Sequence, residues 1–188
     1  MEKEFLCLFL WWFKNKVLPL LPRTKTKKGY DMATPKFLTL DDLYISPFVA
    51  RRVYTEDGEV KWVPMERNLS PTGIEVIDFI ARSMAEGHSD MDWLAQQLGC
   101  SRENMLGWFR TMTGMSARDF RHAYMFRLAD DLLRYTLMGY DEVARRAGFT
   151  SASVLSQQYR KYRHRTAHEV RNAIRQPRDI GRYRAYAL

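Results

Sequence analysis

Cysteine is scarce in this chain. Cys7 and Cys100 are its two cysteines, and neither has a second cysteine close by in the sequence. This scarcity argues against a disulfide framework and against zinc modules bound by paired cysteines. His164 and His168 stand four residues apart, as two metal ligands on a helix can, but the sequence shows no third ligand, so we expect no metal site.

Long apolar runs are also missing. Residues 5–13 (FLCLFLWWF) form a run of nine residues, which is too short to cross a bilayer. The residues before it are not basic and no small-residue cleavage site follows, which argues against a signal peptide. A Pro- and Lys-rich stretch comes next, so we expect residues 1–35 to form a disordered or mis-annotated N-terminus, with residues 1–31 upstream of a natural start at Met32. A hydrophobic anchor or a partner-binding peptide is the open alternative.

The sequence has no recognisable arrangement for catalysis. It contains neither a motif that would place Ser, His and Asp together nor a Gly-rich phosphate loop. We therefore expect no catalytic residues and no cofactor.

Basic charge is abundant but unevenly distributed. Residues 143–188 contain 11 Lys/Arg and 2 Asp/Glu, a net charge of +9, whereas residues 70–142 contain 7 and 11, a net charge of −4. Residues 1–69 contain 12 and 9, a net charge of +3. A basic C-terminal segment of this strength favours a polyanion partner, although a solvated basic tail has the same composition.

The segment 36–69 is predicted to be a small β extension. Residues 48–55 and 59–65 have the composition of two strands, and the Asp-Gly pair between them indicates a hairpin turn. Pro64 indicates that the second strand lies at an edge. The extension is too small to form a ligand-binding barrel.

Residues 70–176 have a helical pattern throughout, and a frayed tail is expected over 177–188. Ser70 followed by Pro71 predicts the start of the first helix, and Ser116 predicts the cap of a long helix over 116–136. At 1.5 Å per residue that helix is about 31 Å long, close to the roughly 34 Å of one turn of B-DNA. Its apolar residues fall on two sides, so we expect it to be packed from both. Shorter helices are expected over 90–98, 101–113, 141–147, 151–162 and 167–174.

Two of these helix pairs repeat one another. Residues 94–99 (LAQQLG) match residues 143–148 (VARRAG). Further along, Met105 matches Leu155, Phe109 matches Tyr159 and Arg110 matches Arg160. Each copy is a short helix, a Gly-centred turn and a second helix, which is typical of a helix-turn-helix unit. A plain bundle of helical hairpins would not need the matched Ala and Gly.

These segments resemble the AraC/XylS-type transcriptional regulators. The resemblance rests on LAQQLGCS, MLGWF, TGMS, LADDLL, VARRAGF and VLSQQYRKY, with Arg171 near the end, and it covers about residues 72–174. It implies an all-α DNA-binding domain in which a long helix joins two helix-turn-helix units that enter adjacent major-groove segments. With the small N-terminal hairpin, this is the expected fold, and the family implies a bacterial, cytoplasmic regulator.

Three departures from the family are visible. Met125 stands where the family usually has Arg, and His164 stands where Gly or Asp commonly ends the second recognition helix. The N-terminal 69 residues are too few for the ligand-binding barrel that many members have, so the resemblance does not extend to control by a ligand.

The resemblance also implies which residues contact DNA. They are Arg102, Glu103, Leu106 and Arg110 on the first recognition helix, and Ser151, Ser153, Ser156, Gln157, Arg160 and Lys161 on the second. An acid and an aliphatic side chain suit base edges poorly, whereas Gln can bond adenine and cations suit phosphates. The second unit is therefore expected to supply most of the affinity.

Double-stranded DNA is the predicted partner, and RNA polymerase is a further candidate. Nothing in the sequence indicates the oligomeric state. Two alternatives stay open: a protein-interaction module on a degenerate helix-turn-helix scaffold, suggested by Leu106, Gly107 and Trp108, and a regulator anchored to a membrane by residues 5–13.

Overall fold

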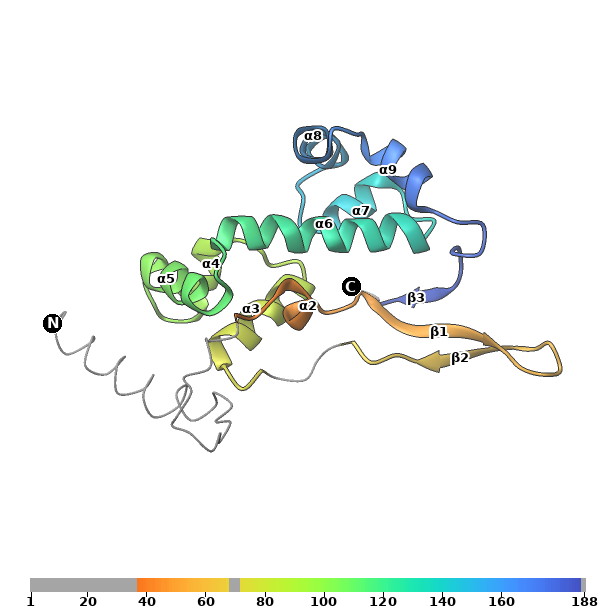
Figure 1. Cartoon of the computed structure of the whole chain (residues 1–188), viewed down its shortest axis with the longest axis horizontal. Coiled ribbons are helices and arrows are strands. Elements are labelled where there is room, and N and C mark those ends of the chain that lie inside the picture. Colours follow the sequence, from red (N-terminus) through yellow and green to blue (C-terminus); the bar gives the residue numbers. More distant parts are fainter. Residues whose placement is uncertain (1–36, 68–71, 187–188) are drawn as a thin grey trace, which may run out of the picture. The chain divides into compact units, whose positions relative to one another are not determined.

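The computed structural model describes residues 37–67 and 72–186, so the prediction for residues 1–35 lies outside the described residues. From Leu38 onward the chain packs as one compact unit. The elements of this unit, shown in Figure 1, are α2 (Leu40–Leu43), β1 (Phe48–Tyr54), β2 (Val60–Pro64), α3 (Glu75–Ala85), α4 (Met91–Gln97), α5 (Arg102–Thr113), α6 (Ala117–Tyr135), α7 (Tyr140–Arg146), α8 (Ala152–Arg163), α9 (Ala167–Ile174) and β3 (Tyr183–Ala185).

Helix α6 is the long helix that the sequence predicts. The Ser116 hydroxyl caps it by accepting a hydrogen bond from the Asp119 N–H at 3.1 Å. Its buried residues are Ala117, Phe120, Tyr124, Met125, Phe126, Leu128, Ala129, Leu132 and Leu133. These positions cover more than one side of the helix, which confirms the predicted two-sided packing.

The other helices pack against different stretches of α6 (Figure 1). Near its start, the ring of Phe120 meets the ring of Phe109 from α5, with 4.8 Å between centroids. Farther along, the ring of Phe126 meets the ring of Tyr159 from α8 at 5.0 Å. One hydrophobic core therefore includes both helix pairs and the helix between them.

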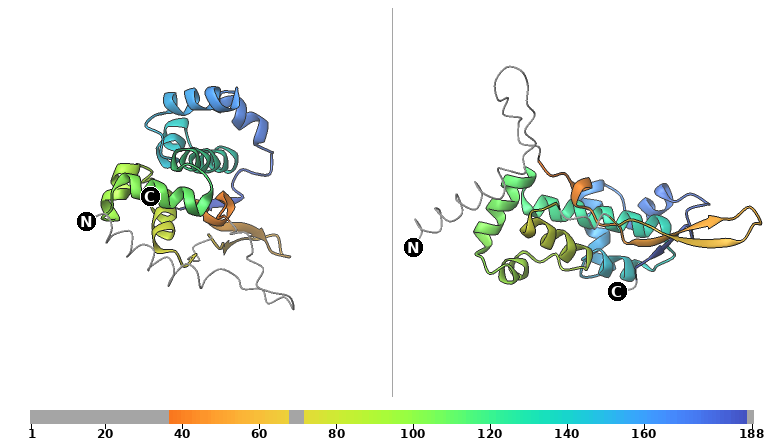
Figure 2. Two further views of the ribbon diagram at one scale, coloured as in Figure 1. Left: turned by 60° about the vertical axis from the view of Figure 1, so that its left-hand side comes forward. Right: turned by 90° about the horizontal axis from the view of Figure 1, so that it is seen from below.

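The β extension is a three-stranded antiparallel sheet in the order β2-β1-β3. The predicted hairpin is confirmed, with Arg52 opposite Trp62, and β2 is an edge strand as Pro64 indicated. Figure 2 shows the hairpin extending away from the helices. Phe48 attaches the sheet to the end of α6, because its ring lies 5.6 Å from that of Tyr135 and 5.0 Å from that of Tyr183.

The C-terminal residues correct the prediction of a frayed tail. Residues 183–185 form β3 beside β1, and the Tyr186 N–H donates to the Pro47 carbonyl at 2.7 Å. Asp179 is 2% exposed, and its carboxylate accepts hydrogen bonds from Arg134 Nε and the Gln176 N–H, both at 2.9 Å. The sequence did not reveal this strand because three residues are too few to show an alternating pattern.

The first helix of the predicted helical region, α3, also begins later than predicted. Helix α3 starts at Glu75, whereas Ser70 and Pro71 lie outside the described residues. The N–H and the hydroxyl of Thr72 both donate to the Asp78 carboxylate, at 2.7 and 2.8 Å. Gly73 follows with a φ of 83°. This local turn delays the helix, so the start predicted at Pro71 is wrong.

Replacing Asp179 with Ala should lower the free energy of unfolding by about 2–3 kcal/mol at pH 7, since it leaves the partly exposed Arg134 without its buried partner. Burial alone would raise the pKa of Asp179, but the hydrogen bonds from Arg134 and the Gln176 N–H hold that pKa below its usual value. The carboxylate therefore stabilises the fold fully above about pH 4, and this contribution is lost as the pH falls through the lowered pKa.

Urea denaturation at pH 7 and at pH 3 measures the loss of stability and its dependence on pH. The difference in free energy of unfolding between Asp179→Ala and the unchanged protein should be smaller at pH 3. The exposed neighbour Arg178 provides the control, because Arg178→Ala should change the stability by less than about 0.5 kcal/mol. Equal stability of Asp179→Ala and the unchanged protein at pH 7 would contradict the assignment.

Candidate nucleic-acid interface

Two helix-turn-helix units of equal size are present. Helices α4 and α7 have 7 residues each, and helices α5 and α8 have 12 residues each. A glycine in the left-handed region makes the turn in each unit, Gly99 with a φ of 62° and Gly148 with a φ of 83°. A residue with a Cβ is strained in that region, which explains why both copies use Gly.

The repeat extends beyond the residues matched in the sequence. Ser101 and Ser151 cap α5 and α8, each accepting a backbone N–H at 3.2 Å. After the second helix of each copy, Ser116 and Thr166 cap the next helices, α6 and α9. The start of α6 is thus the counterpart of α9, and a similar pairing of Ser with Thr at the caps could have revealed it.

The second recognition helix, α8, is attached to α6 by polar contacts. The Tyr159 hydroxyl donates to Asp130 Oδ1 at 2.7 Å, and Arg163 pairs with Asp130 Oδ2 at 2.8 Å. Burial, together with the nearby Asp130 charge, raises the pKa of Tyr159. The phenol therefore stays neutral and continues to donate at neutral pH.

The first recognition helix, α5, is attached by apolar packing instead. Phe109 occupies the position of Tyr159 and has no hydroxyl to reach a carboxylate. The Thr113 hydroxyl donates to the Phe109 carbonyl at 2.8 Å, and the Leu38 N–H donates to the Met112 carbonyl at 3.0 Å. The β extension, which includes Leu38, thus contacts the C-terminal end of α5.

Asp131, the neighbour of Asp130 on α6, binds that same extension. The Tyr44 hydroxyl donates to Asp131 Oδ2 at 2.7 Å, and the Tyr124 hydroxyl lies 3.3 Å from the Ile45 N–H that donates to it. Burial raises the pKa of Asp131 even though the Tyr44 hydrogen bond opposes that rise. Adjacent carboxylates on α6 therefore bind opposite parts of the fold.

The outward face of α8 brings together most of the residues predicted on it. Ser153, Gln157, Arg160 and Lys161 are exposed, and Ser156 is half-buried. The Ser151 hydroxyl is already used as the helix cap. Within the described ranges, neither Arg160 nor Lys161 forms an ion pair, so both cations are available to an anion.

The outward face of α5 is poorer in donors. Glu103 and Arg110 are exposed, whereas Leu106 is half-buried and packs against the core. Arg102 is held in an ion pair with Asp92 at 2.9 Å. Gly107 and Thr111 occupy the positions that correspond to Gln157 and Lys161 of the second unit. The first unit therefore presents one unpaired cation, Arg110, where the second presents two.

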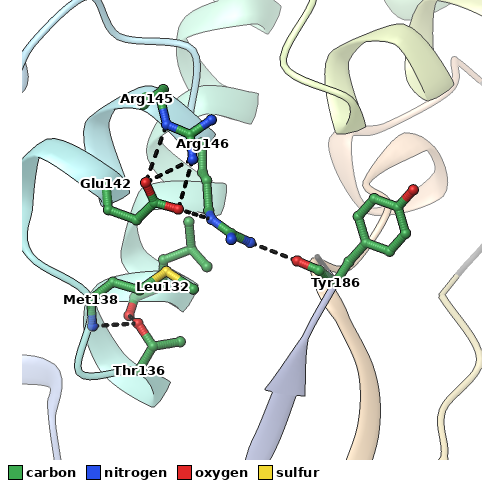
Figure 3. Close-up of polar contacts among 7 residues, drawn as sticks. All are labelled: Leu132, Thr136, Met138, Glu142, Arg145, Arg146 and Tyr186. Atoms are coloured by element: carbon green, nitrogen blue, oxygen red, sulfur yellow. Dashed lines mark hydrogen bonds and ion pairs between the residues drawn. The ribbon is translucent and has the colours of Figure 1, made fainter. Parts of the chain in front are cut away.

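The net charge of +9 overstates the basic surface available to a partner. Figure 3 shows Glu142 accepting hydrogen bonds from Arg145 and Arg146, the latter also donating to the Tyr186 carbonyl at 2.6 Å. The pKa of Glu142 is lowered by these hydrogen bonds, first from Arg146 and then from Arg145. Several cations of the C-terminal segment are therefore already engaged inside the protein.

Two further arginines donate to carbonyls at or just after the C-terminal end of α6. Arg175 donates to the carbonyls of Leu133 and Thr136, at 2.6 and 2.5 Å, and Arg171 donates to the Met138 carbonyl at 2.6 Å. Carbonyls at a helix C-terminus lack partners within the helix and favour nearby cations. These arginines stabilise the fold.

Met125, the departure from the family pattern, lies where the two units meet. It is 5% exposed, and its sulfur lies 4.0 Å from the Ser89 hydroxyl that precedes α4. A Cβ added to Gly148 would lie 3.0 Å from the same hydroxyl. Arg121 Nε also donates to Ser89, at 3.2 Å. The site around Met125 is a tight contact between the units.

Helix α8 ends in an unusual conformation. His164 has φ and ψ of 54° and 26°, and it is the one residue other than Gly with a positive φ among the residues described. Gly114 has the equivalent place at the end of α5, with a φ of 70°. The departure noted at His164 therefore falls on a position whose geometry favours Gly.

Neither of the two described ranges contains a helix long and apolar enough to cross a membrane. No group of three or more His, Cys, Asp or Glu residues in those ranges is placed to bind a metal ion.

The comparisons with known proteins agree with this geometry. Residues 94–173 match a family model described as a helix-turn-helix domain. No curated protein matches the chain. Among solved structures, the C-terminal domain of AraT, a response regulator from Geobacillus stearothermophilus, is 18% identical with a TM-score of 0.51, covering 58% of this chain and 91% of that domain.

Two other solved structures are similar over shorter stretches. The DNA-binding domain of AdpA, a global transcriptional factor solved with a target DNA, is 26% identical with a TM-score of 0.47, covering 52% of this chain and 90% of that one. An AraC-type regulator from Chromobacterium violaceum is 23% identical with a TM-score of 0.42, covering 55% and 95%.

The repeated units and the family match define a tandem helix-turn-helix domain within this chain. The AraT domain has the same fold as this part of the chain.

Replacing His164 with Gly should raise the free energy of unfolding by about 0.5–1 kcal/mol. The left-handed conformation costs an ordinary residue roughly 1–2 kcal/mol, and the greater entropy of Gly in the unfolded chain offsets part of that relief. Thermal and urea denaturation would measure the gain, with His164→Ala as the control that should bring none. A loss of stability in the Gly variant would show that the imidazole makes a contact that outweighs the strain.

Proposed function

We propose that this protein is a sequence-specific regulator of transcription that binds double-stranded DNA through both helix-turn-helix units. Helices α5 and α8 would enter adjacent segments of the major groove, and α8 would supply most of the affinity. The observation that carries the proposal is the pair of matched units packed on one shared helix, with Ser153, Gln157, Arg160 and Lys161 exposed on the second.

The length of α6 supports this docking. Its 19 residues span about 28 Å, slightly less than the roughly 34 Å between equivalent groove positions one turn apart. Both recognition helices pack directly on α6, through Phe109 against Phe120 and through Tyr159 against Phe126. A single helix thus keeps the two recognition helices at a fixed separation.

The predicted contacts divide by chemistry. Arg110, Arg160 and Lys161 suit phosphates, because each is exposed and has no ion-pair partner among the described residues. Gln157 suits an adenine edge, and Ser153 and Ser156 can bond either base type. Glu103 could accept from a cytosine amine, and Leu106 has little free surface for a thymine methyl. Arg102 and Ser151 would position their helices, since both are engaged within the protein.

RNA polymerase is a further proposed partner, and the bacterial cytoplasm the proposed location, both on the strength of the family resemblance. The alternative of a protein-interaction module has less support, because Leu106 and Trp108 are half-buried and leave little free apolar surface on α5. The anchored alternative depends on residues 5–13, which lie outside the described residues.

Replacing Arg160 and Lys161 together with Ala should weaken binding to all duplexes by a similar factor. The slope of log affinity against log salt should flatten by about 0.9 for each phosphate that the protein no longer neutralises. Fluorescence anisotropy with a random-sequence duplex at several salt concentrations measures both quantities. Unchanged affinity at matched salt would remove these residues from the interface.

Replacing Gln157 with Ala should weaken binding to the preferred duplex about 5- to 150-fold, as expected for removing a bidentate hydrogen bond worth about 1–3 kcal/mol, and should barely affect binding to random duplex. A preferred duplex can be obtained by selection from a random pool. Leu106→Ala is the matched variant on the first unit and should have the smaller effect. A larger effect at Leu106 would reverse the proposed ranking of the two units.

A further inference from the structure

One face of α6 packs against α8, and this face extends toward the start of α6 beyond the last turn of α8. The ring of Phe126 lies 5.8 Å from that of Tyr162, in the last turn of α8. His122, one turn earlier on α6, still reaches the same ring at 5.2 Å. Arg118, a further turn earlier in the same row, is exposed. Arg118 and His122 therefore lie beyond the end of α8 on the face of α6 that α8 occupies.

The same stretch adjoins the first unit. Phe120, between Arg118 and His122, packs against Phe109 of α5. Arg121 donates to Ser89, which directly precedes the N-cap of α4. Residues 118–122 thus lie between the two recognition helices, with α5 at one end and the last turn of α8 at the other.

This stretch brings basic side chains from two helices together into what we term the linker patch: Arg118, Arg121 and His122 of α6 and Lys161 of α8. Arg118 and Lys161 are exposed and form no ion pair within the described residues. The Lys161 ammonium lies 5.2 Å from the Tyr162 ring, which His122 also contacts, and the Lys161 charge acts on His122. The nearby acid, Asp119, accepts a hydrogen bond from the Ser116 hydroxyl at 2.6 Å and serves the helix cap.

We propose that the linker patch binds the phosphodiester backbone of the DNA where it crosses between the two groove segments, as a third contact beside the two recognition helices. This inference rests on the proposed function. A duplex that receives α5 and α8 in adjacent segments must pass the stretch of α6 between them. An exposed guanidinium and an exposed ammonium match phosphate oxygens in charge and as donors.

His122 adds a dependence on pH to this contact. The charged and titratable groups around it are Arg118, Asp119 and Arg121 on α6 and Lys161 and Tyr162 on α8. Burial, then the charges of Arg118 and Arg121, lower the pKa of His122, although Asp119 opposes them. A phosphate beside the ring would raise that pKa, because an opposite charge favours the imidazolium. DNA binding would then take up a proton, and affinity would increase as the pH falls.

Arg118→Ala in the full chain tests the contact. With the duplex enriched by selection from a random pool, we expect about a tenfold loss of affinity at matched salt and a salt slope flatter by about 0.9. Arg178→Ala is the control of equal charge. Arg178 precedes Asp179, whose carboxylate pairs with Arg134. Arg134 lies 16 residues along α6 from Arg118, a distance of about 24 Å. It should change affinity by less than about twofold.

Neutral backbone analogues locate the contact. Methylphosphonates in place of the central phosphates should weaken binding by the unchanged protein more than they weaken binding by Arg118→Ala. His122→Gln should flatten the pH dependence of affinity between pH 6 and 8, with circular dichroism showing the fold retained. Equal affinities for Arg118→Ala and Arg178→Ala, or equal losses on the neutral backbone, would overturn the inference while leaving the proposed function intact. If the unchanged protein shows no salt-dependent binding to any duplex, the proposed function itself fails.

Discussion

Asp130 and Asp131 are neighbours on α6, so their side chains leave the helix about 100° apart. One carboxylate accepts from Tyr159 of α8 and the other accepts from Tyr44 after α2. A half-buried carboxylate that loses its donor is costly, so both partners are held firmly. The second recognition helix and the β extension are thereby fixed to the same turn of α6. The remaining elements pack around that arrangement.

The two units share one backbone plan but are attached in different ways. Phe109 of the first is attached by ring packing, while Tyr159 of the second combines ring packing with a hydrogen bond to a charged group. Hydrogen bonds of this kind are directional, so the bond from Tyr159 fixes the orientation of α8 about its own axis as well as its position. The same helix presents the unpaired cations Arg160 and Lys161. The better-fixed unit is thus also the one with the stronger attraction for a polyanion.

Features encoded by neighbouring residues could be predicted from the sequence. Ser116 caps α6, the Asp-Gly pair turns the hairpin, and the spaced Gly and Ala residues reveal the repeat, because each depends on a few adjacent positions. Features that depend on distant partners could not be predicted. The Thr72–Asp78 turn delays α3, β3 needs β1 from the other end of the chain, and Arg171 and Arg175 are engaged by carbonyls of a different segment. The linker patch was missed for the same reason, since His122 meets Tyr162 only through the packing of α8 on α6.

The pairing of β3 with β1 also bears on how the chain folds. The helix-turn-helix units consist of contacts between residues close in sequence, and such contacts form early because little chain entropy is lost in closing them. The sheet instead joins Phe48 to Ala185 and cannot be completed until residues 183–185 have left the ribosome. During synthesis the hairpin and the helices therefore exist before the strand that ties them together. Truncating the chain before Tyr183 would remove that step of assembly while leaving the earlier ones in place.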